Sequence, residues 1–226
     1  MLKFFGDGSD FDTKRGNSNA FYKKNDELIL FDCGSKVYFD LIENDMLEGV
    51  KQVTIFITHL HAGHVGGLPQ LADFLTAQKL MFNRDINYDV YYPNIENIKT
   101  LLDLTLVIQP DSHLHKANES KYVKGIFEQK HAKNAYGYLF EIDDKRFYFS
   151  GDTAEINRDG LDLLLENKVD YFYHEASASK NPYHVCLDEL AEAIPENLRK
   201  KVYLMHINDK MVDRIKELGF CFCKTI

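Results

Sequence analysis

The sequence predicts an α/β fold in which two mixed β-sheets pack face to face between outer helices, an αββα sandwich. Two strand-rich halves alternate with helical segments, and such elements bury their apolar faces best as stacked sheets covered by helices. Residues typical of a linker are not found between the halves. A chain of 226 residues is also long enough to bury one substantial core. We therefore expect a single domain over residues 1–226.

The N-terminal half begins with three strands and continues with alternating helices and strands. Proline near the start of one helix and glycine at the end of another fit the usual helix boundaries. The expected elements are a strand, a glycine-containing turn and two strands over 1–34, a helix in 35–50 closed by Gly49, a strand at 53–58, a helix from Leu68, a strand at 90–93 and a helix at 95–104.

The C-terminal half follows a polar stretch, residues 111–124, which we interpret as a solvated loop in preference to a metal site despite His113 and His115. The expected elements are strands at 125–131, 136–142 and 146–149, a helix at 161–166, a strand at 169–173, a helix at 187–194, a strand at 201–205, a helix at 209–218 and a terminal strand. Cys221 and Cys223 alternate with phenylalanines, so both thiols should lie on one face of that last strand.

Composition narrows the function classes. Hydrophobic residues make up 45% and charged residues 27% of the chain, which is ordinary for a soluble globular protein, and the net charge is -8. This acidity argues against strong general binding of nucleic acid. We see no secretory leader, and no apolar run approaches the roughly 20 residues that span a membrane. The four cysteines form no Cys-x-x-Cys pair, so we expect reduced thiols and a cytoplasmic protein without a membrane partner.

Three histidines stand within six residues, directly after an apolar, β-branched run. Residues 53–57 are typical of a buried strand, and His59, His61 and His64 follow them. Side chains two positions apart on an extended chain share a face, so His59 and His61 can converge, and His64 can approach from beyond the bend at Gly63. Imidazole ligands suit zinc or a similar divalent metal. The sequence therefore predicts a metal site after this strand.

Further polar residues recur at the ends of predicted strands. His59, His131, Asp152, His174 and His206 each fall within about two residues of such an end. Side chains collected from several strand ends are held rigidly by the sheets, and α/β folds place their chemistry there. One such histidine is usually a structural residue, but five repetitions of the pattern favour a shared site.

The histidine run resembles a known signature. His59-Leu60-His61-Ala62-Gly63-His64 is similar to the His-x-His-x-Asp-His motif of the metallo-β-lactamase superfamily, except that glycine replaces the aspartate. Other phrases resemble the ribonuclease Z-like and phosphodiesterase branch of that superfamily, and the resemblance runs from Phe4 to His206. These phrases are Asp32-Cys33-Gly34, Ser150-Gly151-Asp152-Thr153 and His174-Glu175-Ala176-Ser177, followed by His184.

The resemblance implies a metallo-β-lactamase-like fold and a set of metal ligands. The first metal would be bound by His59, His61 and His131, and the second by His64 and His206. Asp152 would bridge the two metals and take part in catalysis. The metal would be zinc, as one or two ions, with Mn²⁺ or another divalent ion as the alternative. Asp32 would orient the metal loop by hydrogen bonding rather than bind metal.

Two further residues are expected to act on the substrate. His174 would serve as the acid for the leaving group or would stabilise the phosphate, because imidazole donates a proton near neutral pH. Glu175 would orient His174.

Position 63 leaves the second metal short of a ligand. Asp7, Asp10 and Glu175 are candidates for a replacement by their nearness to the motifs. We therefore expect weakened activity, and we expect the substitution Gly63→Asp to raise both metal content and hydrolysis.

The resulting prediction is a metal-dependent hydrolase, and specifically a phosphodiesterase for a small nucleotide or cyclic nucleotide. Some members of the branch cleave cyclic nucleotides, including phage-encoded members that degrade a host's cyclic-nucleotide signals. The alternatives are a nuclease that processes the 3′ ends of transfer RNA and a non-catalytic member that binds a ligand in the same cleft. Members of the branch commonly pair, so we also expect a homodimer.

Overall fold

The computed structural model describes residues 1–106 and 113–226, and it confirms the predicted αββα sandwich. Within these residues one sheet has seven strands in the order β13-β1-β2-β3-β4-β5-β6, and the other has six in the order β12-β11-β10-β9-β8-β7. Both sheets are mixed, because β1, β2 and β3 and likewise β7, β8 and β9 pair antiparallel, whereas the other neighbouring strands pair parallel.

The strand bounds are as follows. The first sheet contains β1 (Lys3–Gly6), β2 (Asn19–Lys24), β3 (Glu27–Phe31), β4 (Gln52–Phe56), β5 (Asn87–Tyr91), β6 (Leu114–His115) and β13 (Lys224–Thr225). The second contains β7 (Val123–Gln129), β8 (Ala135–Ile142), β9 (Lys145–Phe149), β10 (Tyr171–Glu175), β11 (Val202–Met205) and β12 (Cys221–Phe222).

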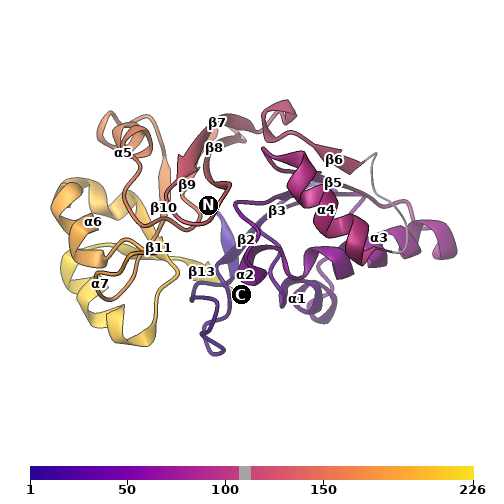
Figure 1. The fold of residues 1–226 in the computed structure, drawn as a ribbon, viewed down its shortest axis with the longest axis horizontal. Coiled ribbons are helices and arrows are strands. Elements are labelled where there is room, and N and C mark those ends of the chain that lie inside the picture. The colour runs from indigo at the N-terminus through magenta and orange to yellow at the C-terminus, as the bar shows by residue number, and fades with distance from the viewer. Residues whose placement is uncertain (107–112) are drawn as a thin grey trace.

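Helices cover the outer faces of both sheets (Figure 1). The α-helices are α1 (Val37–Glu43), α2 (Ala62–Val65), α3 (Leu68–Phe82), α4 (Ile95–Thr105), α5 (Arg158–Leu165), α6 (Leu187–Ala193) and α7 (Val212–Leu218). Short 3₁₀ helices are η2 (Ala117–Glu119), η3 (Glu196–Lys201) and η4 (Asp209–Met211). Apolar side chains of α1, α3 and α4 pack on the first sheet, and those of α5, α6 and α7 pack on the second.

A third apolar cluster fills the space between the sheets, and it is rich in aromatic residues. Phe31 and Phe56 of the first sheet contact Phe140 of the second at ring-centroid distances of 4.9 and 4.8 Å. All three side chains are fully buried. Each such ring contributes about 1.5–3 kcal/mol by burial, so this cluster fixes the two sheets against each other.

Two expectations about the ends of elements need correction. The terminal strand divides, since β12 pairs with β11 and β13 pairs with β1, so the chain crosses from one sheet to the other at Cys223. Cys223 is buried and Cys221 is partly exposed, so the two thiols do not share an environment.

The expected loop over 111–124 is also partly ordered into a strand. Residues 111 and 112 lie outside the described part of the chain. His115 lies in β6, where its Nε2 is 2.8 Å from Asp89, and His113 contacts the backbone oxygen of Tyr88. In the described residues neither histidine belongs to a group of three or more candidate metal ligands. None of the helices in the described residues has the length and apolar character needed to cross a membrane.

Candidate metal centre

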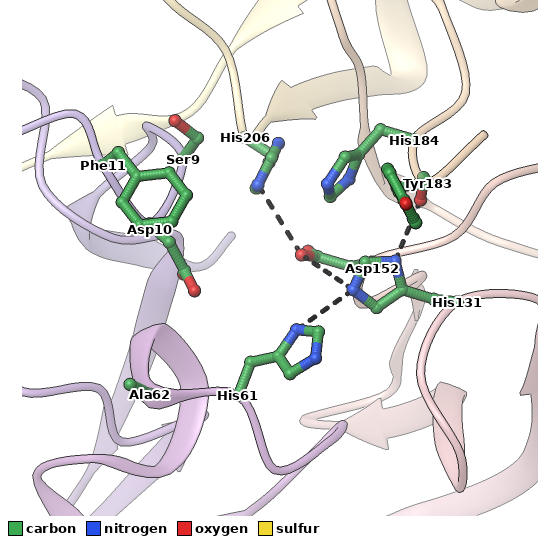
Figure 2. Close-up of a pocket in the computed structure, with 10 residues that line it drawn as sticks. All are labelled: Ser9, Asp10, Phe11, His61, Ala62, His131, Asp152, Tyr183, His184 and His206. Carbon is green, nitrogen blue, oxygen red and sulfur yellow. Dashed lines mark hydrogen bonds and ion pairs between the residues drawn. The ribbon is translucent and has the colours of Figure 1, made fainter. Parts of the chain in front are cut away.

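The predicted metal ligands meet at the ends of strands from both sheets, where four of them line a cavity and His59 and His64 lie buried behind it. His59 follows β4, His61 and His64 lie at α2, and His131, Asp152 and His206 follow β7, β9 and β11. The cavity has a volume of about 450 Å³ (Figure 2). Its lining comprises Ser9, Asp10, Phe11, His61, Ala62, His131, Asp152, Tyr183, His184 and His206.

The first group of ligands is formed by His59, His61 and His131. One nitrogen of each lies within 4.8 Å of the others, and His131 Nε2 is 3.2 Å from His61 Nδ1. The Oδ2 atom of Asp152 is 4.0 Å from His59 Nε2 and 3.9 Å from His131 Nε2. Ligand atoms on opposite sides of a metal are separated by about twice the 2 Å bond, so these distances suit one ion.

The second group contacts the same carboxylate oxygen. His64 Nε2 and His206 Nε2 lie 3.4 and 3.6 Å from Asp152 Oδ2. The structure thus brings four histidines within 4.0 Å of one carboxylate oxygen, with His61 beside two of them, and that aspartate can serve two ions.

Asp32 orients the metal loop as the resemblance implied. It adopts a left-handed backbone conformation (φ 66°), and its carboxylate accepts hydrogen bonds from the backbone N–H and hydroxyl of Thr58 at 2.7 and 2.8 Å. Its Oδ2 is also 2.7 Å from His64 Nδ1. A carboxylate on one ring nitrogen fixes the tautomer and leaves the other nitrogen for a metal.

The donor set fits a divalent cation. His59 Nε2 and Asp152 Oδ1 are buried, and among the described residues neither atom has a hydrogen-bond partner. An unsatisfied buried polar atom costs about 1–3 kcal/mol, and a charged one costs more. A cation among these atoms would remove that cost, and imidazole with carboxylate is a donor set that zinc prefers.

The electrostatics keep Asp152 ionised and His59 neutral, as metal binding requires, but they hold a proton on His64. Burial alone would raise the pKa of Asp152, but the surrounding histidines, His64 first, lower that pKa well below its ordinary value. Burial also lowers the pKa of His59, so its imidazole is neutral. Burial would lower the pKa of His64 as well, but the carboxylates of Asp152 and Asp32 raise it well above 6.5. Binding of a metal would displace the His64 proton.

His174 does not occupy the place expected of a leaving-group acid. Its ring is fully buried and stacks on Phe172 and Tyr148, and it is absent from the lining of the cavity. Its Nδ1 contacts the backbone oxygen of Glu175 at 2.8 Å, and burial lowers its pKa to about 4. The cavity lining includes His184 but not His174, because adjacent positions on β10 point to opposite faces and the His174 ring lies on the core side.

His184 lines the cavity in its place. Its Nδ1 is 2.8 Å from Glu175 Oε2, and its ring stacks on that of His206 at 4.3 Å. Glu175 therefore orients a histidine as expected, but the histidine is His184. The resemblance had drawn attention to His184, although its role was not assigned.

The three candidates for a carboxylate near position 63 lie in different surroundings. Asp7 forms a two-pronged ion pair with Arg15, and Glu175 binds the backbone of Thr153 and the ring of His184. Asp10 lines the cavity, and its Oδ1 lies 3.8 Å from His64 Nε2.

Two β-sheets under outer helices, with histidines and an aspartate at the strand ends, define a protein of the metallo-β-lactamase fold. The chain belongs to the family of the anti-Pycsar protein Apyc1, because the sequence model of that family matches residues 1–224. The anti-Pycsar protein Apyc1 of Bacillus phage BSP38 is 25% identical over 249 residues, which cover 97% of this chain and 93% of that protein.

Solved structures agree on the fold. The metallo-β-lactamase-fold protein YhfI of Bacillus subtilis has a TM-score of 0.74 at 13% identity, over 100% of this chain and 95% of that one. The short form of human tRNase Z has a TM-score of 0.67 at 22% identity, over 93% of each chain.

Proposed function

We propose that the chain is a metal-dependent phosphodiesterase that hydrolyses a small nucleotide, most specifically a cyclic nucleotide. The observation that carries the proposal is the cluster of four histidines around the buried Asp152, with His61 beside two of them, in the wall of a cavity. Zinc bound there supplies a Lewis acid, which withdraws charge from a phosphate oxygen and acidifies a water molecule. Mn²⁺ or another divalent ion is the alternative to zinc.

The rim of the cavity suits a nucleobase. Phe11 and Tyr183 line the cavity and are 94% and 65% exposed, which is unusual for large apolar rings. Bases stack on such rings for about 1–3 kcal/mol each. A volume of about 450 Å³ also lies within the range of small-ligand pockets. These features favour a nucleotide over a bulky RNA substrate.

His184 is proposed to protonate the leaving oxygen. Its Nδ1 contacts Glu175, which leaves Nε2 as the nitrogen available in the cavity. Burial and the charge of Asp152 raise the pKa of Glu175 well above its usual value, whereas burial lowers that of His184 to about 4. The raised pKa of Glu175 favours a proton held between the two groups, and that proton can pass to the substrate through the ring.

The comparisons support a nucleotide as substrate without identifying it. The relative from Bacillus phage BSP38 is named as an anti-Pycsar protein, and the branch that the sequence resembles includes members that cleave cyclic nucleotides. The human neighbour in structure is named as a tRNase.

The proposal is tested by assaying zinc-loaded protein against 3′,5′-cyclic nucleotides, bis(p-nitrophenyl) phosphate and precursor transfer RNA. We expect cyclic nucleotides to yield linear monophosphates and chelation to abolish turnover. His131→Gln should lower kcat/KM by about a hundredfold or more. The control His113→Gln, which alters a histidine outside the cavity, should not. Zinc-loaded protein without turnover would instead support a non-catalytic member, and cleavage of transfer RNA alone would support the nuclease.

A second pair of variants separates His184 from His174. His184→Gln should lower kcat while zinc content stays the same. His174→Gln should lower the melting temperature and leave the kcat of the folded protein nearly unchanged, because His174 is buried in the apolar core. The reverse pattern would return the acid role to His174.

We also propose a homodimer. The apolar residues Leu80, Met81 and Phe82 at the end of α3 and Leu104 in α4 are strongly exposed. Exposed groups of large apolar side chains commonly mark an interface between chains. We propose that formation of a homodimer buries these four apolar side chains.

A further inference from the structure

The carboxylate of Asp10 occupies the space in which an aspartate side chain at position 63 would begin. A Cβ atom added to Gly63 would lie 1.6 Å from Asp10 Oδ1 and 2.5 Å from Asp10 Cγ. These two residues are 53 positions apart in the sequence, so the contact arises only from the fold. Glycine at position 63 therefore makes room for the Asp10 side chain.

The candidate ligands near Asp10 are His64 and His206 of the second group and His61 of the first. Its Oδ1 lies 3.8 Å from His64 Nε2, and the Asp10 charge acts on both His61 and His206. Figure 2 shows its carboxylate pointing to the side of the cavity formed by His61 and Ala62. The Oδ1 atom is buried, and no hydrogen-bond partner for it occurs in the described residues. A buried carboxylate oxygen without a partner is costly unless it binds a cation.

The loop that carries Asp10 is held firmly beside the metal ligands. Gly8 forms β-bridges with both Asn17 and Ile207, the residue after His206. The backbone N–H of Ile207 donates a hydrogen bond to Asp7 at 2.9 Å. The loop base is thus tied to the same segment that positions His206, so Asp10 and His206 keep their relative places. Metal ligands must be held in fixed relative positions before the metal binds, and this loop attachment provides that for Asp10 and His206.

We propose that Asp10 is a ligand of the second metal and replaces the aspartate that position 63 lacks. With His64, His206 and Asp152 it gives four protein donors, the number that zinc prefers. The inference rests on the proposed function, because it requires a metal at the histidines. It also corrects the expectation for Gly63→Asp, since a carboxylate is already present where the new one would be added.

The test counts zinc rather than turnover. Chelated protein is given excess zinc and dialysed, its zinc content is measured by elemental analysis, and stepwise affinities are measured by competition with a chromophoric chelator. We expect two zinc ions per chain in the natural sequence and about one in Asp10→Asn, with the weaker affinity reduced at least about tenfold. The double exchange Asp10→Ala with Gly63→Asp should bind two, whereas Gly63→Asp alone should gain none.

Asp12→Asn is the matched control, because Asp12 is in the same loop and its Oδ1 accepts hydrogen bonds that an amide oxygen can also accept. It should retain two ions. If Asp10→Asn also keeps two ions with unchanged affinity, the inference fails while the proposed function stands. A natural chain that binds a single ion regardless of Asp10 overturns the inference and leaves a one-metal hydrolase. If the natural chain binds none, both proposals fail.

Discussion

Asp152 organises the site at the scale of single residues. It is buried, and its Oδ2 lies within 4.0 Å of a ring nitrogen of each of His59, His64, His131 and His206. An ionised carboxylate in such a place must be paired, and protonated imidazole can pair it when no metal is bound. The same side chains therefore form ion pairs with one another when no metal is bound, and they form a binding site when a cation is present. Exchange between proton and metal makes the site sensitive to pH.

We predict that the metal-free protein loses stability as the pH falls from about 6.5 to about 4. Burial lowers the folded-state pKa of His184 to about 4 and that of His59 well below its usual value. In this window the unfolded chain, with ordinary histidine pKa values near 6.5, takes up protons at these positions that the folded chain does not. The raised pKa values of Glu175, Asp32 and Asp7 act in the opposite direction. They are outnumbered by the histidines whose pKa values are lowered in the folded chain, which are His59, His61, His174, His184 and His206. His64 has a raised pKa, so it is protonated in both states there and adds nothing.

Thermal unfolding in the presence of a chelator at several pH values measures this effect. The melting temperature should fall with pH in that window, and it should fall less steeply in His184→Gln. Above pH 6.5 His64 has the opposite effect on stability. Its proton stabilises the folded chain, and this stabilisation is lost as the pH rises through the folded-state pKa of His64. A melting temperature independent of pH from 6.5 to 4 would contradict the assignment of lowered pKa values.

Sequence alone reached some of these residues and missed others for physical reasons. His59, His61 and His64 are close in sequence, so a strand and a bend suffice to bring them together. The sequence analysis assigned the acid role to His174 and not to His184. The strand β10 is central and has buried residues on both faces, so its sequence shows no alternation that would indicate which side chain faces the cavity. Asp10 was one of three candidates, and only the folded chain shows which carboxylate lies above Gly63.

At the scale of elements, the site depends on the close approach of two loops, the turn after β3 and the turn after β4. Asn19 joins them, because its side chain accepts a hydrogen bond from the Gly34 backbone and donates one to the Gly63 oxygen. A Cβ atom on Gly34 would lie 2.1 Å from that same oxygen. Only glycine therefore permits the loops to approach.

We predict that Gly34→Ala separates the two loops. The clash is with backbone, which cannot move as readily as a side-chain tip, so we expect a loss of about 1–3 kcal/mol in the free energy of unfolding. Zinc affinity should fall as His64 shifts. Chemical denaturation and chelator competition measure the two effects, and Gly49→Ala, at an open position outside the site with its own strained conformation, helps separate general strain from loss of metal. A Gly34→Ala protein with natural stability and affinity would contradict this view of the loops.

The predicted elements were mostly correct because their patterns are local. The apolar run before His59 forms β4, and the strand pair around the Asp143-Asp144 turn forms β8 and β9. The terminal strand was wrong, because its division between the two sheets is decided by distant partners, Tyr203 and Lys3. Nothing in residues 220–225 alone distinguishes one strand from two.

For the whole molecule, the two sheets meet through an aromatic layer and bring ligands from both halves of the chain to one cavity. Assembly is a separate question. We predict a homodimer in solution, with the exposed end of α3 in the interface. Light scattering should report about twice the chain mass of 26.2 kDa at micromolar concentration.

Charged substitutions test where the chains meet. Met81→Glu together with Phe82→Glu should give monomers. Burying two glutamate charges in the interface is unfavourable by more free energy than the apolar contacts of the dimer provide. Lys224→Glu, which changes an exposed position at the C-terminal end, serves as the control. A monomer in the natural protein would contradict the homodimer, and a dimer that survives the double substitution would place the interface elsewhere.

The most direct measurement of the central claim is anomalous diffraction at the zinc edge from crystals of the zinc-loaded protein. We predict two peaks on either side of Asp152, one among His59, His61 and His131 and the other beside His64 and His206. A single peak at the first position would reduce the centre to one metal. The absence of any peak at these histidines in zinc-loaded crystals would contradict the account.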